Sequence, residues 1–143
     1  MNLVFKLSIQ VSTDDIDELN HANNVTYLRW VIDAAVEHSI SLGYGLKQFA
    51  ELGGAFVVRK HELEYLRPAL LGEKITVETW ISSFEGPSTL REYRILRDSD
   101  GKTLFTGRTL WVWVDFQTGR SKPIPAELVA AYGPFLKTSA PIE

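Results

Sequence analysis

The sequence contains no cysteine among its 143 residues. Disulfide bonds, thiolate metal sites and a cysteine nucleophile are therefore excluded. The chain has only three histidines, and their spacing is not that of zinc ligands, so we expect no metal site. A long apolar run is also missing from the first residues, Met1 to Val11, which alternate polar and apolar side chains. We therefore expect neither a signal peptide nor a membrane span there.

The chain also has no large excess of positive or negative charge, because its formal net charge is only −3. A general affinity for nucleic acid or for an acidic membrane is therefore not expected. The sequence has no Gly-x-Ser-x-Gly elbow of a serine hydrolase and no phosphate-binding glycine loop. With 45% hydrophobic residues, the chain suits one domain over residues 1–143 with a real core. The absence of cysteine fits a cytoplasmic location.

The segment from Val25 to Leu42 has the pattern of a helix with one narrow polar stripe. The stripe recurs at spacings of three and four residues and consists of Thr26, Arg29, Asp33, Glu37 and Ser41. Most of the remaining surface is apolar, so we expect an almost wholly buried helix with an Arg29–Asp33 pair on its polar face. Asn23 or Asn24 can cap its start, and Gly43 and Gly45 end it.

Alternating and β-branched segments joined by turn residues predict antiparallel strands for much of the remaining chain. The expected strands are Leu3–Val11, Ala55–Leu66, Lys74–Phe84, Thr89–Arg97 and Thr103–Phe116. The apolar phase of the second strand changes along its length, which predicts a bulge near Lys60. Leu46–Leu52 can form one or two helical turns, and Pro125–Tyr132 suits a short terminal helix.

One long apolar helix and an antiparallel sheet that must bury one face predict an α+β fold. The economical arrangement is a curved sheet of about five strands wrapped around the helix, with the last four strands as a meander. Three tryptophans lie on the strands, where they serve the core or a subunit interface: Trp80, Trp111 and Trp113.

A dense polar cluster stands where the helix begins: Asp17, His21, Asn23 and Asn24. Buried helices seldom begin in such a cluster, and the first N–H groups of a helix are unpaired at a positive dipole end. We therefore interpret the cluster as a reaction site. A loop or capping role for Asp17 and a structural role for His21 are the alternatives, and capping by the asparagines is compatible with either. His38 and His61 are interpreted as structural or exposed.

The pattern Asp-x-x-x-His-x-Asn-Asn-x-x-Tyr, from Asp17 to Tyr27, resembles the hotdog-fold acyl thioesterases. Similar sequences occur in bacterial acyl-CoA thioesterases related to hydroxybenzoyl-CoA thioesterase and in plant acyl-acyl-carrier-protein thioesterases. The segments Glu64–Ala69 and Val114–Pro125 match the same family, so the resemblance covers most of the chain. Leu19 departs from the plant enzymes, which carry an asparagine of the catalytic group there. Another branch of the family uses a glutamate within the helix, but Asp33 and Glu37 lie on the polar stripe, so Asp17 is preferred.

The resemblance implies hydrolysis of an acyl-CoA thioester to a free acid and the CoA thiol. Asp17 would act as general base on water or as nucleophile, and the sequence leaves both open. The backbone N–H of Asn24 would polarise the carbonyl group, with His21 and Asn23 assisting. No cofactor is implied, since coenzyme A enters only as part of the substrate.

The resemblance also implies an acyl chain along the buried helix and a coenzyme A arm that crosses a subunit boundary in a homodimer or homotetramer. The candidate acyl-wall residues are Tyr27, Val31, Val58 and Tyr65. The candidate phosphate contacts are Arg59, Lys60, Arg67, Arg120 and Lys122. Two alternatives to a hydrolase stay open: a hydratase or dehydratase on acyl-CoA, and a module that binds acyl-CoA without chemistry.

Overall fold

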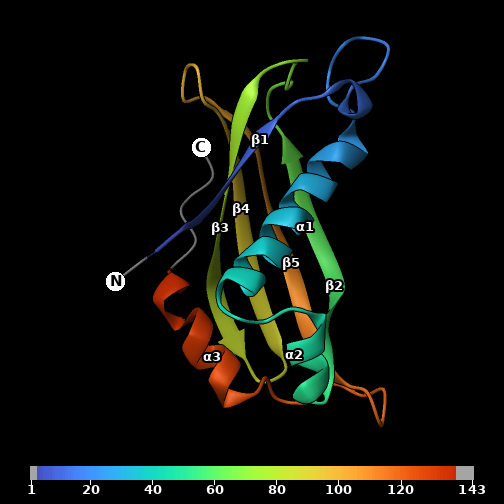
Figure 1. Ribbon diagram of the computed structural model, residues 1–143, viewed down its shortest axis with the longest axis vertical. Coiled ribbons are helices and arrows are strands. Elements are labelled where there is room, and N and C mark those ends of the chain that lie inside the picture. Colours follow the sequence, from blue (N-terminus) through green and yellow to red (C-terminus); the bar gives the residue numbers. More distant parts are fainter. Residues whose placement is uncertain (1–2, 138–143) are drawn as a thin grey trace.

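The computed structural model describes residues 3–137 and contains a five-stranded sheet, one long helix and two short ones (Figure 1). The strands are β1 (Phe5–Gln10), β2 (Gly54–Tyr65), β3 (Lys74–Glu85), β4 (Ser88–Arg97) and β5 (Thr103–Asp115). The helices are α1 (Asn24–Ser41), α2 (Leu46–Glu51) and α3 (Ala126–Tyr132), with 3₁₀ turns at Thr13–Asp15 and Gly133–Phe135. These bounds lie within two residues of the sequence expectations.

The strand order in the sheet is β1-β3-β4-β5-β2, and every neighbouring pair is antiparallel. The expected meander of four strands is therefore wrong for β2, which pairs with β5 at the far edge and not with β3. The expected bulge in β2 is confirmed, because the register shifts between Val58 and Lys60 and leaves Arg59 as the extra residue. β1 and β2 are the two edges of the sheet.

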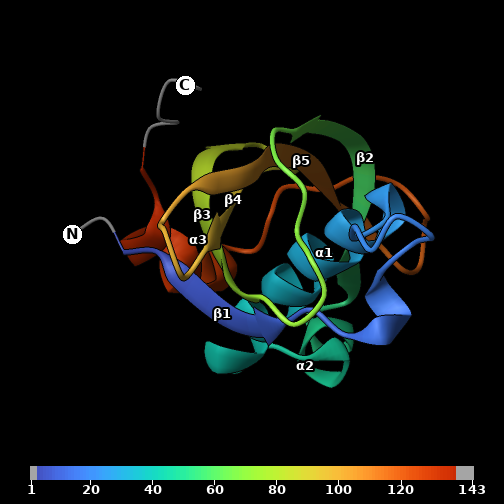
Figure 2. The ribbon, with the colours of Figure 1, turned by 90° about the horizontal axis from the view of Figure 1, so that it is seen from above.

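The sheet curves around α1, which lies on its concave side (Figure 2). This is the expected architecture, and it follows from the pattern of α1, whose sheet-facing side carries Tyr27, Trp30, Val31 and Ala34. These residues pack with inward-facing strand residues that include Ile75, Val77, Tyr93, Ile95 and Phe105. The fold is thus a helix held in a sheet by one continuous apolar contact.

The expectation of an almost wholly buried helix is too strong for the single chain. Val25, Val36 and Ile40 are 75%, 49% and 50% exposed, because the sheet covers only one side of α1. Thr26 differs in the other direction: it belongs to the predicted polar stripe but is buried, with its hydroxyl group donating to the carbonyl oxygen of Asp15. An apolar side of α1 is therefore left without a partner in residues 3–137.

The tryptophans divide between the two sides of the sheet. Trp113 is buried in a second apolar cluster with Ile124 and Leu128, and Trp111 packs against the main core. Trp80 is buried on the opposite side, where the ammonium group of Lys137 lies 4.5 Å from its ring centre.

A polar cluster lies inside the core, between the second half of α1 and β4. The Nη1 group of Arg91 donates to Nδ1 of His38 at 2.9 Å and to Oγ1 of Thr79 at 3.0 Å. Since a guanidinium group can only donate, Nδ1 of His38 is the acceptor and the imidazole is neutral. Burial, together with the nearby positive charge of Arg91, lowers the pKa of His38 from 6.5 to about 3. His38 is therefore a structural histidine, as expected.

The buried His38 generates a prediction about pH. Between pH 6.5 and 3 the unfolded chain protonates His38 and the folded chain does not, so the free energy of unfolding falls as the pH falls through this window. We expect a loss of about 1–2 kcal/mol at pH 5 relative to pH 7 from this group. Urea unfolding at both pH values measures it. His38→Gln, which keeps an acceptor for Arg91, removes this share of the pH dependence, whereas an unchanged dependence would contradict it.

A second prediction concerns the close approach of β2 and β5. A Cβ atom on Gly54 would lie 2.4 Å from the backbone oxygen of Val114, whereas one on Gly133 would meet nothing within 4 Å. Gly54→Ala should therefore lower the free energy of unfolding by about 1–3 kcal/mol through overpacking. Gly133→Ala is the control without a close contact. It places an alanine with helical dihedral angles before Pro134, which is unfavourable, so a loss smaller than that of Gly54→Ala is expected. Equal free energies of unfolding of the two variants in urea would contradict this, because they would show that β2 and β5 can move apart at Gly54 without a loss of stability.

Candidate active site

The segment that precedes α1 forms a tight loop closed by an antiparallel bridge between Ile16 and Ala22. Within it, the backbone N–H of Asp17 donates to the carbonyl oxygen of His21 at 2.8 Å, and the N–H of Asn20 donates to that of Asp17 at 3.0 Å. Asn20 takes a positive φ of 62°, which asparagine tolerates better than most residues. The loop thus reverses the chain between Ile16 and Ala22, and α1 begins two residues later, at Asn24.

Asp17 is exposed, and its own loop orients its carboxylate group. Oδ1 accepts from the backbone N–H of Leu19 at 2.9 Å and from that of His21 at 3.4 Å. Oδ2 accepts no hydrogen bond from any of residues 3–137. One oxygen atom of the carboxylate group therefore fixes its orientation, and the other is left to meet water or a ligand.

The start of α1 has one capped and two uncapped N–H groups. Asn23 is the N-cap, and its Oδ1 accepts from the N–H of Thr26 at 3.0 Å. The backbone N–H groups of Asn24 and Val25 have no acceptor among the described residues, and both residues are exposed. The positive end of the helix dipole and these two donors together favour a negatively charged or carbonyl oxygen. Of the two asparagines that could cap the helix, Asn23 is therefore the cap, and a catalytic role for either stays a prediction.

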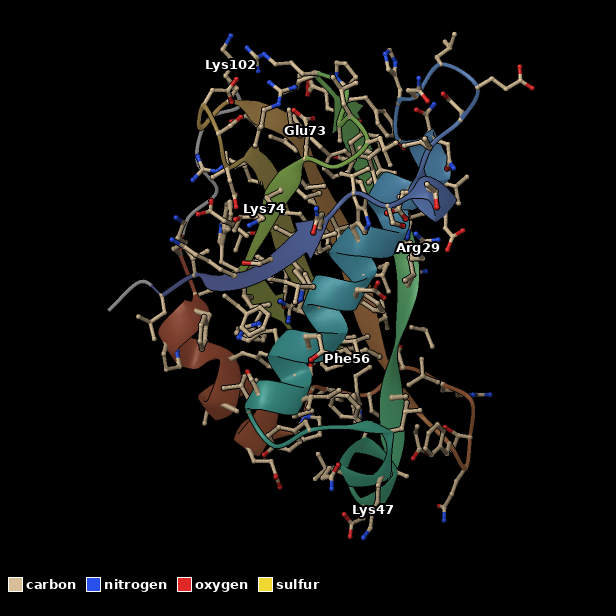
Figure 3. All side chains as sticks on the ribbon, turned by 45° about the horizontal axis from the view of Figure 1, so that its top comes forward. Arg29, Lys47, Phe56, Glu73, Lys74 and Lys102 are labelled. Carbon is tan, nitrogen blue, oxygen red and sulfur yellow. The ribbon has the colours of Figure 1, made fainter. Side chains whose placement is uncertain are left out.

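A buried carboxylate group that sequence reasoning missed supports this end of the helix. Asp15 is 5% exposed and pairs with Arg29 at 2.5 Å, so the expected Arg29–Asp33 pair is wrong. Its other oxygen accepts from the backbone and side chain of Ser12. Figure 3 shows Arg29 on α1 beside the segment that carries Asp15. The Ser-x-x-Asp spacing from Ser12 to Asp15, which resembles a capping box, is the signal that could have identified the buried acid.

Two tyrosines connect α1 to the end of β2 and the loop that follows. The hydroxyl group of Tyr27 accepts from the N–H of Ala69 at 2.8 Å and donates to the carbonyl oxygen of Arg67 at 3.4 Å. The hydroxyl group of Tyr65 donates to the carbonyl oxygen of Asn24 at 3.1 Å. Burial raises the pKa of Tyr27, which keeps its hydroxyl group protonated. Tyr27 is buried, whereas Tyr65 is 43% exposed beside the helix start.

The other predicted residues near α1 lie in several environments. His21 is half-buried, and its ring forms no hydrogen bond within residues 3–137. Val31 is fully buried in the core. Val58, Arg59 and Lys60 are exposed on the edge strand β2, where Lys60 pairs with Glu62.

The predicted phosphate contacts do not gather at one place in the single chain. Arg67 is exposed near the end of β2 and donates to the carbonyl oxygen of Thr103. Arg120 and Lys122 follow β5, whose last residue Asp115 pairs with Gly54 at the start of β2. Since β2 has 12 residues, that end lies roughly 35 Å along the strand from Tyr65. Lys122 there pairs with Asp115 at 3.6 Å.

Two cavities stand out in the described chain. One of about 700 Å³ lies over strands β2 to β5 and includes Trp80, Glu92 and Arg108 in its lining. The other, of about 440 Å³, lies between α2, the second half of α1 and the sheet. Neither is lined by Asp17, His21, Asn23 or Asn24. The start of α1 is thus exposed and lies outside both cavities, with one carboxylate oxygen and two N–H groups that have no partner among residues 3–137.

The chemistry available at this end is that of water activation and carbonyl polarisation. Within residues 3–137 no three His, Asp or Glu residues are placed to hold a metal ion. None of the described helices combines the length and the apolar character that crossing a bilayer demands.

Comparison with known proteins identifies thioesterases as relatives of this chain. The profile of the thioesterase-like superfamily matches residues 11–132. The long-chain acyl-CoA thioesterase FadM of Escherichia coli is 25% identical over 123 residues, which are 84% of this chain and 90% of that protein. A palmitoyl-acyl carrier protein thioesterase of Gossypium hirsutum is 24% identical over 98% of this chain, which spans only 35% of that plant protein's length.

Solved structures support the fold. The Staphylococcus aureus protein SAV2348, solved in complex with CoA, superimposes with a TM-score of 0.89 at 20% identity, covering 100% of this chain and 90% of that one. A 1,4-dihydroxy-2-naphthoyl-CoA thioesterase from Synechocystis gives a TM-score of 0.84 at 18% identity, covering 91% of this chain and 96% of that one. The architecture is the hotdog fold expected from the sequence. Because the profile matches most of the chain, this protein belongs to the thioesterase-like superfamily.

Proposed function

We propose that the protein hydrolyses acyl-CoA thioesters at the start of α1. The observation that supports this most directly is that one short segment carries both an oriented carboxylate group, on Asp17, and the unpaired helix N–H groups of Asn24 and Val25. The family, in which several relatives carry the names of acyl-CoA thioesterases, agrees with this chemistry.

In the proposed reaction, the Asn24 N–H polarises the thioester carbonyl group, and Val25 offers a second donor beside it. Asp17 then removes a proton from water as water attacks the carbonyl carbon, or attacks it directly as nucleophile. In either route the helix N–H groups stabilise the tetrahedral oxyanion, whose collapse breaks the C–S bond. In the first route the departing thiolate takes the proton that Asp17 removed from water. In the second route the collapse leaves a mixed anhydride on Asp17, which water hydrolyses to the free acid and the Asp17 carboxylate, while the thiolate takes a proton from that water. His21, whose ring is unpaired, can hold the water or the thioester. Asn23 keeps the helix start in place through its cap.

We further propose that the protein is a homodimer formed through the free edge of β2. This edge is 12 residues long and exposes Val57, Val58 and Tyr65, whereas monomeric proteins usually block long edges. Antiparallel pairing of two β2 strands would place the start of one beside the end of the other. Arg120 and Lys122 of the partner subunit would then approach the open site, where they could meet CoA phosphates. The acyl-wall role of Tyr65 and Val58 and the cytoplasmic location remain predictions.

The activity prediction uses Asp17→Asn. The amide oxygen can accept the same bonds from the N–H groups of Leu19 and His21, so the loop should keep its structure. Turnover of acyl-CoA should fall by about 10²–10⁴-fold, because the base or nucleophile is lost. Thiol release, measured over short, long and aromatic acyl-CoA esters, provides the assay. Asp14→Asn, an exposed acid of the preceding 3₁₀ turn, is the control and should retain activity.

The same assay separates the alternatives. Turnover of Asp17→Asn equal to that of the native protein would refute the role of Asp17. Conversion of enoyl-CoA to hydroxyacyl-CoA without thiol release would indicate a hydratase. Tight binding of acyl-CoA without thiol release by the native protein would indicate a binding module.

The dimer prediction uses Val57→Lys combined with Val58→Lys on β2. Two charged side chains on an edge strand oppose pairing with a second copy, so the mass in solution should halve. Light scattering after size-exclusion chromatography measures the mass. Val129→Lys, at an exposed position of α3, is the control and should leave the mass unchanged. A native protein with the mass of a monomer would contradict the proposed dimer.

A further inference from the structure

The feature that calls for a ligand is Arg91, a buried cation without an anion. Its position on β4 directs the side chain to the concave side of the sheet, and it is only 4% exposed. A guanidinium group keeps its charge in proteins, and a charge taken out of water is costly unless it is paired. All its neighbours are neutral: His38, Thr79 and Tyr132, whose ring centre lies 5.5 Å from the guanidinium carbon.

Arg91 lacks the carboxylate partner that four other arginines of the described chain have. Each of four arginines meets an aspartate or glutamate in the described chain: Arg29, Arg94, Arg97 and Arg108. All four are more exposed than Arg91, which forms no ion pair with any of residues 3–137. The most deeply buried of these five guanidinium groups is thus the one without a counter-ion.

Arg91 lines the cavity of about 440 Å³ between α2, the sheet and the second half of α1. Most of the wall is apolar and includes Val36, Ile40, Phe49, Phe56 and Trp111. Phe56, labelled in Figure 3, lies on β2 beside this half of α1. The volume falls within the range of small-molecule sites. A cavity with an apolar wall and one cation suits a ligand with an apolar body and one anionic group. A phosphate group, which carries up to two negative charges, would exceed the single positive charge in this wall.

We propose that this cavity binds a carboxylate with an apolar body, whose carboxylate group pairs with the guanidinium group of Arg91. Two arginine N–H groups can meet two carboxylate oxygens in parallel, which gives the pair a defined orientation. The carboxylate has two possible sources: a free carboxylic acid, or the far end of an acyl group whose thioester lies at the start of α1. Ser39, on the cavity wall, is fifteen residues along α1 from Asn24, or roughly 22 Å, so only a long acyl group would reach both.

The binding test compares three ligands with the same apolar body: decanoate, 1-decanol and decylamine, each titrated into the native protein by calorimetry. We expect decanoate to bind at least tenfold more tightly than 1-decanol, and decylamine to bind most weakly. Arg91→Met should lose the preference for decanoate, because the cation is gone while the volume is kept. Arg94→Met, on the outward side of the same strand, is the matched control and should bind as the native protein does.

A second variant keeps Arg91 and fills the cavity, in case Arg91→Met does not fold. Ile40→Trp changes a half-exposed wall position and should abolish decanoate binding, whereas Val129→Trp on α3 should not. Equal affinity of the native protein for decanoate and 1-decanol would overturn the proposal. A preference for decanoate that survives in a folded Arg91→Met variant would overturn it too, and would leave Arg91 a purely structural cation. Decanoate binding that survives Ile40→Trp would place the ligand outside this cavity and would also overturn it.

The source of the carboxylate is decided with two substrates, hexadecanedioyl-CoA and palmitoyl-CoA. If the far end of the acyl group occupies the cavity, kcat/KM should favour the dicarboxylic substrate, and Arg91→Met should remove that preference. If a free acid is the ligand, Arg91→Met should leave the ratio of the two substrates unchanged while decanoate binding is lost. The calorimetry needs no turnover, so failure of the proposed thioesterase activity and failure of this site are distinguishable.

Discussion

The burial of one side of α1 in the concave face of the sheet is the contact on which the rest of the structure depends. Tyr27, Trp30, Val31 and Ala34 place the helix axis along the strands. Burial of a side chain as large as Val31 adds about 1.5–3 kcal/mol of favourable transfer free energy, and burial of Ala34 adds less. Because a helix is rigid, packing one side of α1 against the sheet also determines where both of its ends lie. The first turn is presented at one end of the sheet and the last turns at the other.

The two ends have different chemical characters for reasons that lie in the chain. At the first turn, Asn23 satisfies one N–H group and leaves those of Asn24 and Val25 free, so this end attracts an electron-rich oxygen. In the last turns, Ser39 bonds with Tyr132 and Nδ1 of His38 accepts from Arg91, so these polar groups are turned inward. Nε2 of His38 is buried and has no hydrogen-bond partner among residues 3–137. The first turn, where we propose the reaction, is thus exposed, and the last turns line the cavity.

The fold could be predicted largely from the sequence because each strand alternates with period two and α1 carries a polar stripe with helical spacing. The pairing of β2 with β5 could not, since alternation says which side of a strand is buried and not which strand lies beside it. The Asp17 segment could be selected as a candidate site because several polar residues precede an apolar helix, and its role stays a prediction. Asp15 was missed because its partner, Arg29, lies fourteen residues away, and the nearer Asp33 offered a local alternative.

The burial of Arg91 could be predicted from the alternation of side chains along β4 but not from its residue type. Tyr93 and Ile95 face the core, so alternation places Arg91 on the same side, although its charge suggests solvent. Parity prevails because the neighbours Glu92 and Arg94 must face outward, where they pair with Arg108 and Glu78. Moving the strand by one residue to release Arg91 would turn the charges of Glu92 and Arg94 into the apolar core and move Tyr93 and Ile95 to the outer side of the sheet. The strand therefore keeps the guanidinium group of Arg91 inside the core, where no carboxylate group of residues 3–137 neutralises its charge.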